Sequence, residues 1–283
     1  MKSATRTSMH PILFEIAGYP VAAYGMALLL AFVAGIAVAT RRARAQGLNA
    51  DRVLDCSMLI LVSSILGARL LWVVTHPAVF RPPLGSWLDA VNPFQGPAGF
   101  GIVGLSMLGG VVLALLSSVA FFVYHRLPVL PYVDVIMPSV LLGEGITRIG
   151  CFLNGCCHGL VCAVPWGVRF PDGSPAATLF PGAAVHPTQL YAAALGFGSF
   201  AFLVWLARRR PFPGAIFFAG LILVGGYRIA LDFVRYYESQ VILFRAAGTH
   251  FTINQLISLV LVLAGIAGIA VLWRRQRLAS AGG

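Results

Sequence analysis

The chain has 283 residues, of which 59% are hydrophobic and only 10% are charged. Ordinary soluble domains carry about 25% charged residues, so a soluble globular protein is excluded for lack of a polar surface. The formal net charge is +11, but the arginines lie at the ends of apolar segments and not on one amphipathic face, so we expect no nucleic-acid partner.

Seven apolar segments approach the length of about 20 residues that a helix needs to cross a bilayer. In chain order they cover residues 19–40, 54–75, 100–124, 132–153, 189–207, 213–235 and 253–273. The first is too long for the apolar part of a cleavable signal peptide, and no small-residue cleavage site follows it. We therefore predict an all-α integral membrane protein of about seven transmembrane helices, with residues 1–283 forming one polytopic domain.

Basic clusters predict the orientation of these segments. They follow the first, third, fifth and seventh segments and comprise Arg41, Arg42, Arg44, Arg126, Arg208, Arg209, Arg210, Arg274, Arg275 and Arg277. With seven spans they all fall on one side, which the positive-inside rule makes the cytoplasm. We expect the N-terminus outside and the C-terminus in the cytoplasm. Lys2 and Arg6 oppose this orientation but are outnumbered.

Two longer loops then face outward, over residues 76–99 and 154–188. The second is rich in residues that favour turns, among them Pro165, Pro171, Gly173 and Pro175. We expect a small folded cap there, on the periplasmic side, and not a flexible linker.

Several ionisable residues fall in or at the ends of the predicted spans. They are Asp134, Glu144, Asp232, Arg69, Arg148, Arg228 and Arg235. Each is costly at bilayer depth unless it is paired or hydrated, which makes each a candidate for function. Structural ion pairs between helices are the alternative for any one of them.

The strongest candidate lies in the segment G-G-Y-R-I-A-L-D-F-V-R. Arg228, Asp232 and Arg235 are spaced i, i+4 and i+7, which predicts that all three share one helix face. Two arginines beside a carboxylate fit a cavity that holds an anion, and the planar guanidinium suits a phosphate in particular.

Two further motifs carry polar groups at the outer ends of spans. Residues 143–159 contain Arg148, Asn154 and a run of glycines that permit close approach of a ligand or helix. The segment H-P-T-Q-L-Y supplies His186, Gln189 and Tyr191 at the start of the fifth span. A tyrosine there is also typical of the aromatic belt at a membrane interface.

Taken in order, these motifs resemble the prolipoprotein diacylglyceryl transferases. The resemblance runs from about Pro20 to Leu272 and includes R-I-G-C-F-L-N-G-C-C-H-G, W-G-V-R-F-P-D, H-P-T-Q-L-Y, G-Y-R-I-A-L-D-F-V-R and T-I-N-Q-L-I-S. It implies a multi-pass enzyme of the bacterial inner (cytoplasmic) membrane. Such an enzyme moves the diacylglyceryl group of phosphatidylglycerol to the lipobox cysteine of a preprolipoprotein signal peptide. The products are a thioether and glycerol-1-phosphate, and no cofactor or metal is expected.

The resemblance also implies roles for individual residues. Three residues would be catalytic: Arg148, which would contact the lipid phosphate, Arg228, which would lie at the catalytic cavity, and Asp232, which stands where the family has an acidic residue. Further residues that we expect to bind substrate are Arg235, Tyr24, Asn154, Gly159, His186, Gln189 and Tyr191.

The chain departs from the family at three positions. Leu108 stands where the family commonly has a histidine, and it cannot take a proton; Cys151 replaces an asparagine, and Cys156 a glutamate. The base that accepts the thiol proton is therefore open among His158, His186 and the field of the arginines alone. A non-catalytic lipid-binding or transport protein, or a transferase with another acceptor, is the competing interpretation.

Four cysteines cluster in sequence at Cys151, Cys156, Cys157 and Cys162. Cysteine thiolates are soft ligands, so the cluster could bind a metal ion. However, the spacing lacks paired CxxC elements, and the adjacent Cys156 and Cys157 are poorly placed to bind one ion together. A disulfide in an oxidising compartment and simple apolar packing are the other readings, and we expect no metal site.

Overall fold

The computed structural model describes residues 11–16, 19–80, 104–209, 211–237, 242–246 and 249–281, together with Ser86 and Asn92. Most of the loop predicted over residues 76–99 lies outside the described residues. The same holds for Lys2, Arg6 and Arg210, which entered the prediction of orientation.

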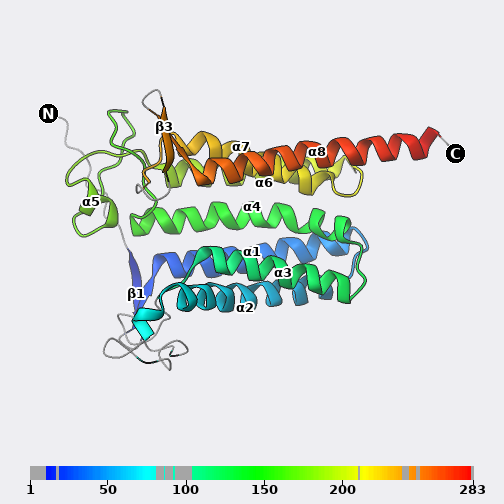
Figure 1. The fold of residues 1–283 in the computed structure, drawn as a ribbon, viewed down its shortest axis with the longest axis horizontal. Coiled ribbons are helices and arrows are strands. Elements are labelled where there is room, and N and C mark those ends of the chain that lie inside the picture. The colour runs from blue at the N-terminus through cyan, green and yellow to red at the C-terminus, as the bar shows by residue number, and fades with distance from the viewer. Residues whose placement is uncertain are drawn as a thin grey trace. The chain divides into compact units, whose positions relative to one another are not determined.

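Seven long helices dominate the structure (Figure 1), and all seven are long and apolar enough to cross a membrane. They are α1 (Ala23–Ala45), α2 (Ala50–Thr75), α3 (Met107–Tyr124), α4 (Val129–Asn154), α6 (Thr188–Arg208), α7 (Ala215–Asp232) and α8 (Ile253–Ala281). The prediction of an all-α membrane protein with seven spans is confirmed. Many large apolar side chains on these helices are exposed, as expected where the surrounding solvent is lipid.

Four short strands and two short helices complete the described part of the fold. The antiparallel pair β1 (Ile12–Ile16) and β2 (Tyr19–Ala22) leads into α1. A second pair, β3 (Ile242–Ala246) and β4 (Thr249–Thr252), leads into α8. The short helices are η1 (Pro77–Phe80) and α5 (Pro175–Leu179). The sequence prediction missed both hairpins and began the first span at residue 19, inside β2.

The chain divides into two compact units, residues 1–42 with 133–283 and residues 43–132. In the second unit α2 and α3 pack closely. Glycine at position 67 permits this approach, since a side chain there would collide with the backbone of Gly109. Arg69, a candidate for function by sequence, lies in this unit and donates a hydrogen bond of 3.2 Å to the carbonyl of Gly104.

The first unit contains α4, α6 and α7 around one apolar core. Its buried members include Met137, Leu141, Leu203, Ile216, Tyr227 and Leu231. Asp134 on α4 anchors α7 to this core, since its carboxylate accepts hydrogen bonds from the N–H groups of Gly214 at 2.6 Å and Phe217 at 2.7 Å. Gly214 has no side chain with which to cap α7, and a carboxylate at a helix N-terminus also complements the helix dipole. The position of Asp134 is thus explained by structure.

The segment between α4 and α6 is folded, as its turn-rich composition predicted. Phe170, Ala176 and Val185 form a small buried cluster there. Val185 pairs with both Val161 and Val168 across isolated β-bridges. Short-range turns and this cluster give the cap a defined shape without long secondary structure.

Candidate active site

Arg148 lies on the last turns of α4, one helical turn after Glu144. Its guanidinium is 3.4 Å from the Glu144 carboxylate, and the two side chains are 17% and 21% exposed. The hydroxyl of Tyr227 on α7 donates a hydrogen bond to the other oxygen of Glu144. Glu144 therefore orients Arg148 on α4 and fixes it relative to α7.

Arg228 and Asp232 lie one turn apart on α7, as predicted, but the predicted helical stripe is wrong for Arg235. The helix ends at Asp232, and Arg235 instead pairs with Gly159 through an antiparallel β-bridge. The physical reason is backbone pairing beyond the helix, since the Leu160 N–H donates to the Val234 carbonyl at 2.9 Å and the Tyr236 N–H donates to the His158 carbonyl at 3.3 Å. Asp232 itself is buried, with 1% exposure. Its two oxygens accept hydrogen bonds from Tyr237 at 2.6 Å and Thr252 at 2.7 Å.

Among the residues that the structure describes, Asp232 forms no ion pair with Arg228 or with Arg235. Burial is the main reason that the pKa of Tyr237 is raised, with the charge of Arg235 opposing it. The Tyr237 hydroxyl consequently stays protonated and donates to Asp232. These contacts give Asp232 a structural task at the end of α7.

The three arginines nevertheless lie in one region, since each pair of them acts electrostatically on a shared neighbouring residue. The charges of Arg148 and Arg228 both act on Tyr227. Those of Arg228 and Arg235 both act on Tyr237. Arg148 and Arg235 both act on the thiol of Cys157. The ends of α4 and α7 thus bound a region with three arginines and the two acidic residues Glu144 and Asp232. Among the described residues only Arg148 pairs with a carboxylate there.

Arg235 stands at the edge of a cavity of about 330 Å³. Its guanidinium carbon lies 5.1 Å from the centre of the Tyr237 ring, and its Nε is buried without a hydrogen-bond partner among the described residues. The cavity is lined by Cys156, Cys157, His158, Pro175, Leu179, Arg235, Tyr236 and Tyr237. An unpaired buried donor beside a cavity is suited to an anionic ligand.

Gly159, which follows the cavity-lining His158, brings three segments together. A Cβ at this position would lie 2.6 Å from both the His186 Cβ and the Val234 carbonyl oxygen. Its N–H donates a hydrogen bond of 2.9 Å to the His186 carbonyl. The structure therefore explains Gly159 by close packing, whereas the prediction of substrate contact at this position is not tested.

Tyr24 and Asn154, also predicted to bind substrate, lie near the same region. Tyr24, in the first turn of α1, is 40% exposed and interacts electrostatically with Arg148. Asn154 is the last residue of α4 and hydrogen-bonds with the Cys156 thiol. Both predictions stand as proposals.

The H-P-T-Q-L-Y motif braces the turn that follows α4. The Thr188 hydroxyl donates to the Cys157 carbonyl at 2.9 Å, and the Gln189 amide donates to the Cys156 carbonyl at 2.7 Å. Tyr191 accepts a hydrogen bond of 2.6 Å from Trp166 and lies 3.4 Å from His186 Nδ1. The motif positions the cysteine-bearing turn, whatever further contact His186, Gln189 or Tyr191 makes with a substrate.

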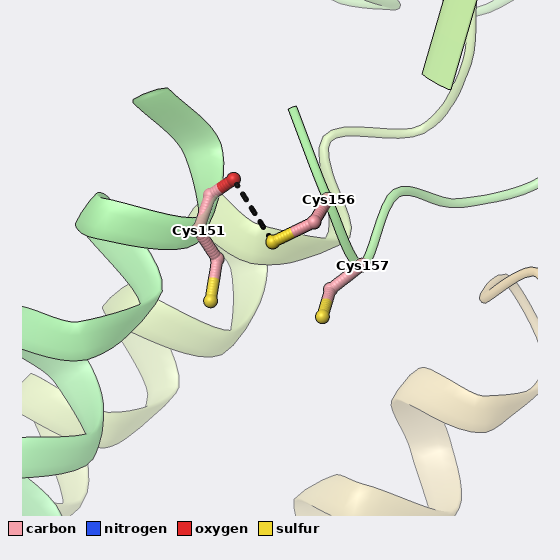
Figure 2. A group of neighbouring side chains, drawn as sticks. All are labelled: Cys151, Cys156 and Cys157. Atoms are coloured by element: carbon pink, nitrogen blue, oxygen red, sulfur yellow. Dashed lines mark hydrogen bonds between the residues drawn. The ribbon is translucent and has the colours of Figure 1, made fainter. Parts of the chain in front are cut away.

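The turn itself gathers three of the five free cysteines. The sulfur atoms of Cys151, Cys156 and Cys157 all lie within 4.8 Å of one another (Figure 2). Hydrogen bonding with the thiols of Cys151 and Cys156 lowers the pKa of Cys157, and the charges of Arg235 and Arg148 act in the same direction against burial. The sequence argument that the adjacent Cys156 and Cys157 are poorly placed to bind one ion together is therefore wrong, because their sulfur atoms lie close enough to do so.

His158 and His186 are the two candidate bases for the thiol proton. Of these two, only His158 lines the cavity. His158 is 4% exposed, stacks on Tyr236, and places Nδ1 3.0 Å from the Gly159 carbonyl oxygen. Leu108, the third position relevant to proton transfer, is 65% exposed and belongs to the other compact unit.

Comparison with known proteins agrees with the motifs. The profile of the prolipoprotein diacylglyceryl transferase family matches residues 11–271. The phosphatidylglycerol–prolipoprotein diacylglyceryl transferase of Clostridium tetani is 30% identical over 80% of this chain and 86% of its own length. That of Geobacter sulfurreducens is 31% identical over 94% of this chain and 96% of its own length. The chain is thus a multi-pass membrane protein and belongs to the prolipoprotein diacylglyceryl transferase family.

Proposed function

We propose that this chain transfers the diacylglyceryl group of phosphatidylglycerol to the lipobox cysteine of a preprolipoprotein signal peptide. The observation that carries the proposal is the grouping of Arg148, Arg228 and Arg235 at the ends of α4 and α7. This grouping combines with membership of a family whose relatives are named for that reaction. The products are the thioether-linked lipoprotein precursor and glycerol-1-phosphate.

The arginines suit the lipid half of the reaction. The substrate phosphate is a diester that leaves with an additional negative charge when its bond to the diacylglyceryl carbon breaks. Guanidinium groups held in place before the reaction stabilise that charge as it develops. Arg148, held by Glu144, and Arg228 are the residues that we assign to the phosphate, and the unpaired Nε of Arg235 offers a third donor.

The substrate and product also constrain where the site operates. We infer a location in the bacterial inner membrane with the cap on the periplasmic side, where the signal peptides of preprolipoproteins emerge. The acyl chains of the lipid stay in the bilayer while its headgroup reaches Arg228. We therefore infer a lateral opening toward the outer leaflet, between α4 and the end of α7.

A non-catalytic lipid-binding protein is the second candidate, and Leu108 is the observation that favours it. A leucine at the usual histidine position removes one proton acceptor. The three arginines and the cavity do not depend on that residue, so binding of phosphatidylglycerol is compatible with either candidate. Transfer to a thiol separates the two.

The test is transfer by the purified full-length chain from phosphatidylglycerol in mixed micelles to a lipobox peptide, read by the mass of the peptide. A diacylglyceryl adduct on the cysteine peptide, and none on a matched peptide with serine, supports the transferase. Binding of phosphatidylglycerol without any adduct supports the lipid-binding candidate. Complementation of a strain depleted of its own transferase checks the result in cells.

A further inference from the structure

The three sulfur atoms at the end of α4 form a cluster that the roles assigned above do not use. Cys151 lies on α4, and Cys156 and Cys157 lie on the turn that follows it. Figure 2 shows the three side chains arranged around one space, and all sulfur–sulfur distances are within 4.8 Å. Cys151 is buried and the other two are half-buried, so the cluster is shielded but reachable.

The backbone is shaped to bring these sulfurs together. Cys157 has a φ of 60°, in the left-handed region that non-glycine residues rarely occupy, and Gly155 before it has a φ of 71°. Such a conformation costs of order 1 kcal/mol and persists where the surroundings enforce it. Here Thr188 and Gln189 enforce it by binding the carbonyls of Cys157 and Cys156.

The surroundings suit an anionic metal–thiolate centre. The charges of Arg235 and Arg148 both act on the Cys157 thiol, so they offset the negative charge that several thiolates around one ion would carry. Cys156 and Cys157 also line the cavity of about 330 Å³. One side of the cluster consequently faces a space large enough to admit a ligand from outside the chain.

We propose that Cys151, Cys156 and Cys157 bind one Zn²⁺ ion and leave its fourth position open to the cavity. Thiolates bind soft or borderline cations preferentially. Catalytic zinc sites typically have three protein ligands and one open position. Sulfurs bound at about 2.3 Å to a tetrahedral ion lie about 3.8 Å apart. The sulfur–sulfur distances in the cluster are all within 4.8 Å, which is at most about 1 Å longer than this spacing.

The open position is the place for the acceptor thiol, an assignment that rests on the transferase proposed above. A thiol that coordinates Zn²⁺ gives up its proton to water and binds as thiolate, which removes the need for a base at residue 108. That sulfur then forms a bond to the diacylglyceryl carbon as the carbon–oxygen bond to phosphate breaks. The bonding electrons leave with the phosphate oxygen, and the neutral thioether, a weak ligand, leaves the ion.

The binding test uses Co²⁺ as a spectroscopic probe in the full-length chain, purified in detergent and reduced. We expect one Co²⁺ per chain, with absorption typical of tetrahedral thiolate coordination. Cys151→Ser, Cys156→Ser and Cys157→Ser should each weaken binding at least about tenfold, while Cys162→Ser, in the same cap, should bind like the wild type. Failure of the reduced wild type to bind, or equal binding by the cluster variants, overturns the site.

The open position is tested by adding a lipobox peptide to the Co²⁺-loaded chain. The cysteine peptide should raise the thiolate-to-cobalt absorption by about a third, since three sulfur ligands become four, and the serine peptide should not. An unchanged spectrum overturns the open position. This readout needs no variant and no turnover.

A last measurement separates this proposal from the proposed function. Removal of the metal from the wild type with a chelator should lower transfer at least about tenfold, and Zn²⁺ should restore it. Unchanged transfer by demonstrably metal-free protein overturns the role of the ion and leaves the transferase standing. Metal binding with no transfer under any condition leaves the site standing and overturns the transferase.

Discussion

The Asp232 carboxylate accepts a hydrogen bond of 2.7 Å from the Thr252 hydroxyl, twenty residues further along the chain. The same hydroxyl accepts the Gln255 N–H at 3.1 Å, and the Gln255 side chain accepts the Thr252 N–H at 3.0 Å. This is a reciprocal capping box at the start of α8, and it joins the end of α7 to that start. Asp232 therefore stabilises the fold around the arginines, which differs from the catalytic role implied by family resemblance.

Asp232→Ala should lower the free energy of unfolding by about 3 kcal/mol, because two buried hydrogen bonds to a carboxylate are lost. Thr252→Val should lower it by about half as much. Denaturant unfolding in detergent measures both. Asp55→Ala, which removes an exposed ion pair with Arg52 at 3.6 Å, is the control and should change stability by under about 0.5 kcal/mol. A tenfold loss of transfer in Asp232→Ala with unchanged stability would contradict this structural role and indicate a catalytic one.

Arg148→Lys and Arg228→Lys should each lower the rate of transfer at least about tenfold, equivalent to about 1.4 kcal/mol of transition-state stabilisation. Lysine keeps the positive charge but loses the planar fork that binds two phosphate oxygens. The rate is measured with saturating phosphatidylglycerol. Arg277→Lys, far along α8 and packed on Trp273 at 3.7 Å, is the matched control and should transfer at the wild-type rate. Wild-type rates in both site variants would remove these arginines from the site.

Asp134→Ala should destabilise the chain by about 1–2 kcal/mol through loss of the cap on α7. Because the hydrogen bonds of the carboxylate go to backbone groups of Gly214 and Phe217, transfer per folded molecule should stay within about threefold of the wild type. Thermal unfolding and the transfer assay together check this. Loss of transfer without loss of stability would assign Asp134 a functional role that its hydrogen bonds do not explain.

Gly159→Ala should prevent the cap from packing, since its Cβ would lie 2.6 Å from the Val234 carbonyl oxygen and 2.6 Å from the His186 Cβ. Overpacking of this kind costs about 1–3 kcal/mol or more. Gly198→Ala is the control, because a Cβ at that position of α6 meets no atom within 4 Å and alanine favours a helix. We expect low yield and easy proteolysis of the cap only for Gly159→Ala. Equal behaviour of the two variants would contradict the packing role of Gly159.

The spans were predictable because a bilayer demands long apolar segments, and their bounds differ from those of the helices by up to eight residues. The ends were harder. Spacing alone extended the sixth predicted span, which is α7 in the structure, to Arg235, whereas the backbone after Asp232 pairs with the turn that follows α4. The T-x-x-Q pattern of Thr252 and Gln255 is itself a sequence signal for the capping box at the start of α8.

The candidate site was predictable in its charges and not in its cysteines. Motif order pointed to Arg148 and Arg228, and in the structure the charges of both act on Tyr227. The convergence of Cys156 and Cys157 depends on the positive φ of Cys157, a conformation that general rules disfavour for any residue but glycine. Two side chains distant in sequence, Thr188 and Gln189, enforce that conformation, so local spacing carried no sign of it.

The basic residues predict which side of the membrane the C-terminus and the cap face. Basic clusters lie at the C-terminal ends of α1, α6 and α8, and Arg126 follows α3. On seven spans they share one side, so the C-terminus after Ala281 should be cytoplasmic and the cap periplasmic. A fluorescent reporter that matures only in the cytoplasm should be active when fused to the C-terminus. Alkaline phosphatase, active only in the periplasm, should be inactive there and active when inserted at Gly173, whose position is open. The reverse pattern would place the arginines, the cavity and the cysteine cluster at the cytoplasmic face. No translocated lipobox peptide could reach them there, and the proposed transfer would then lack its acceptor.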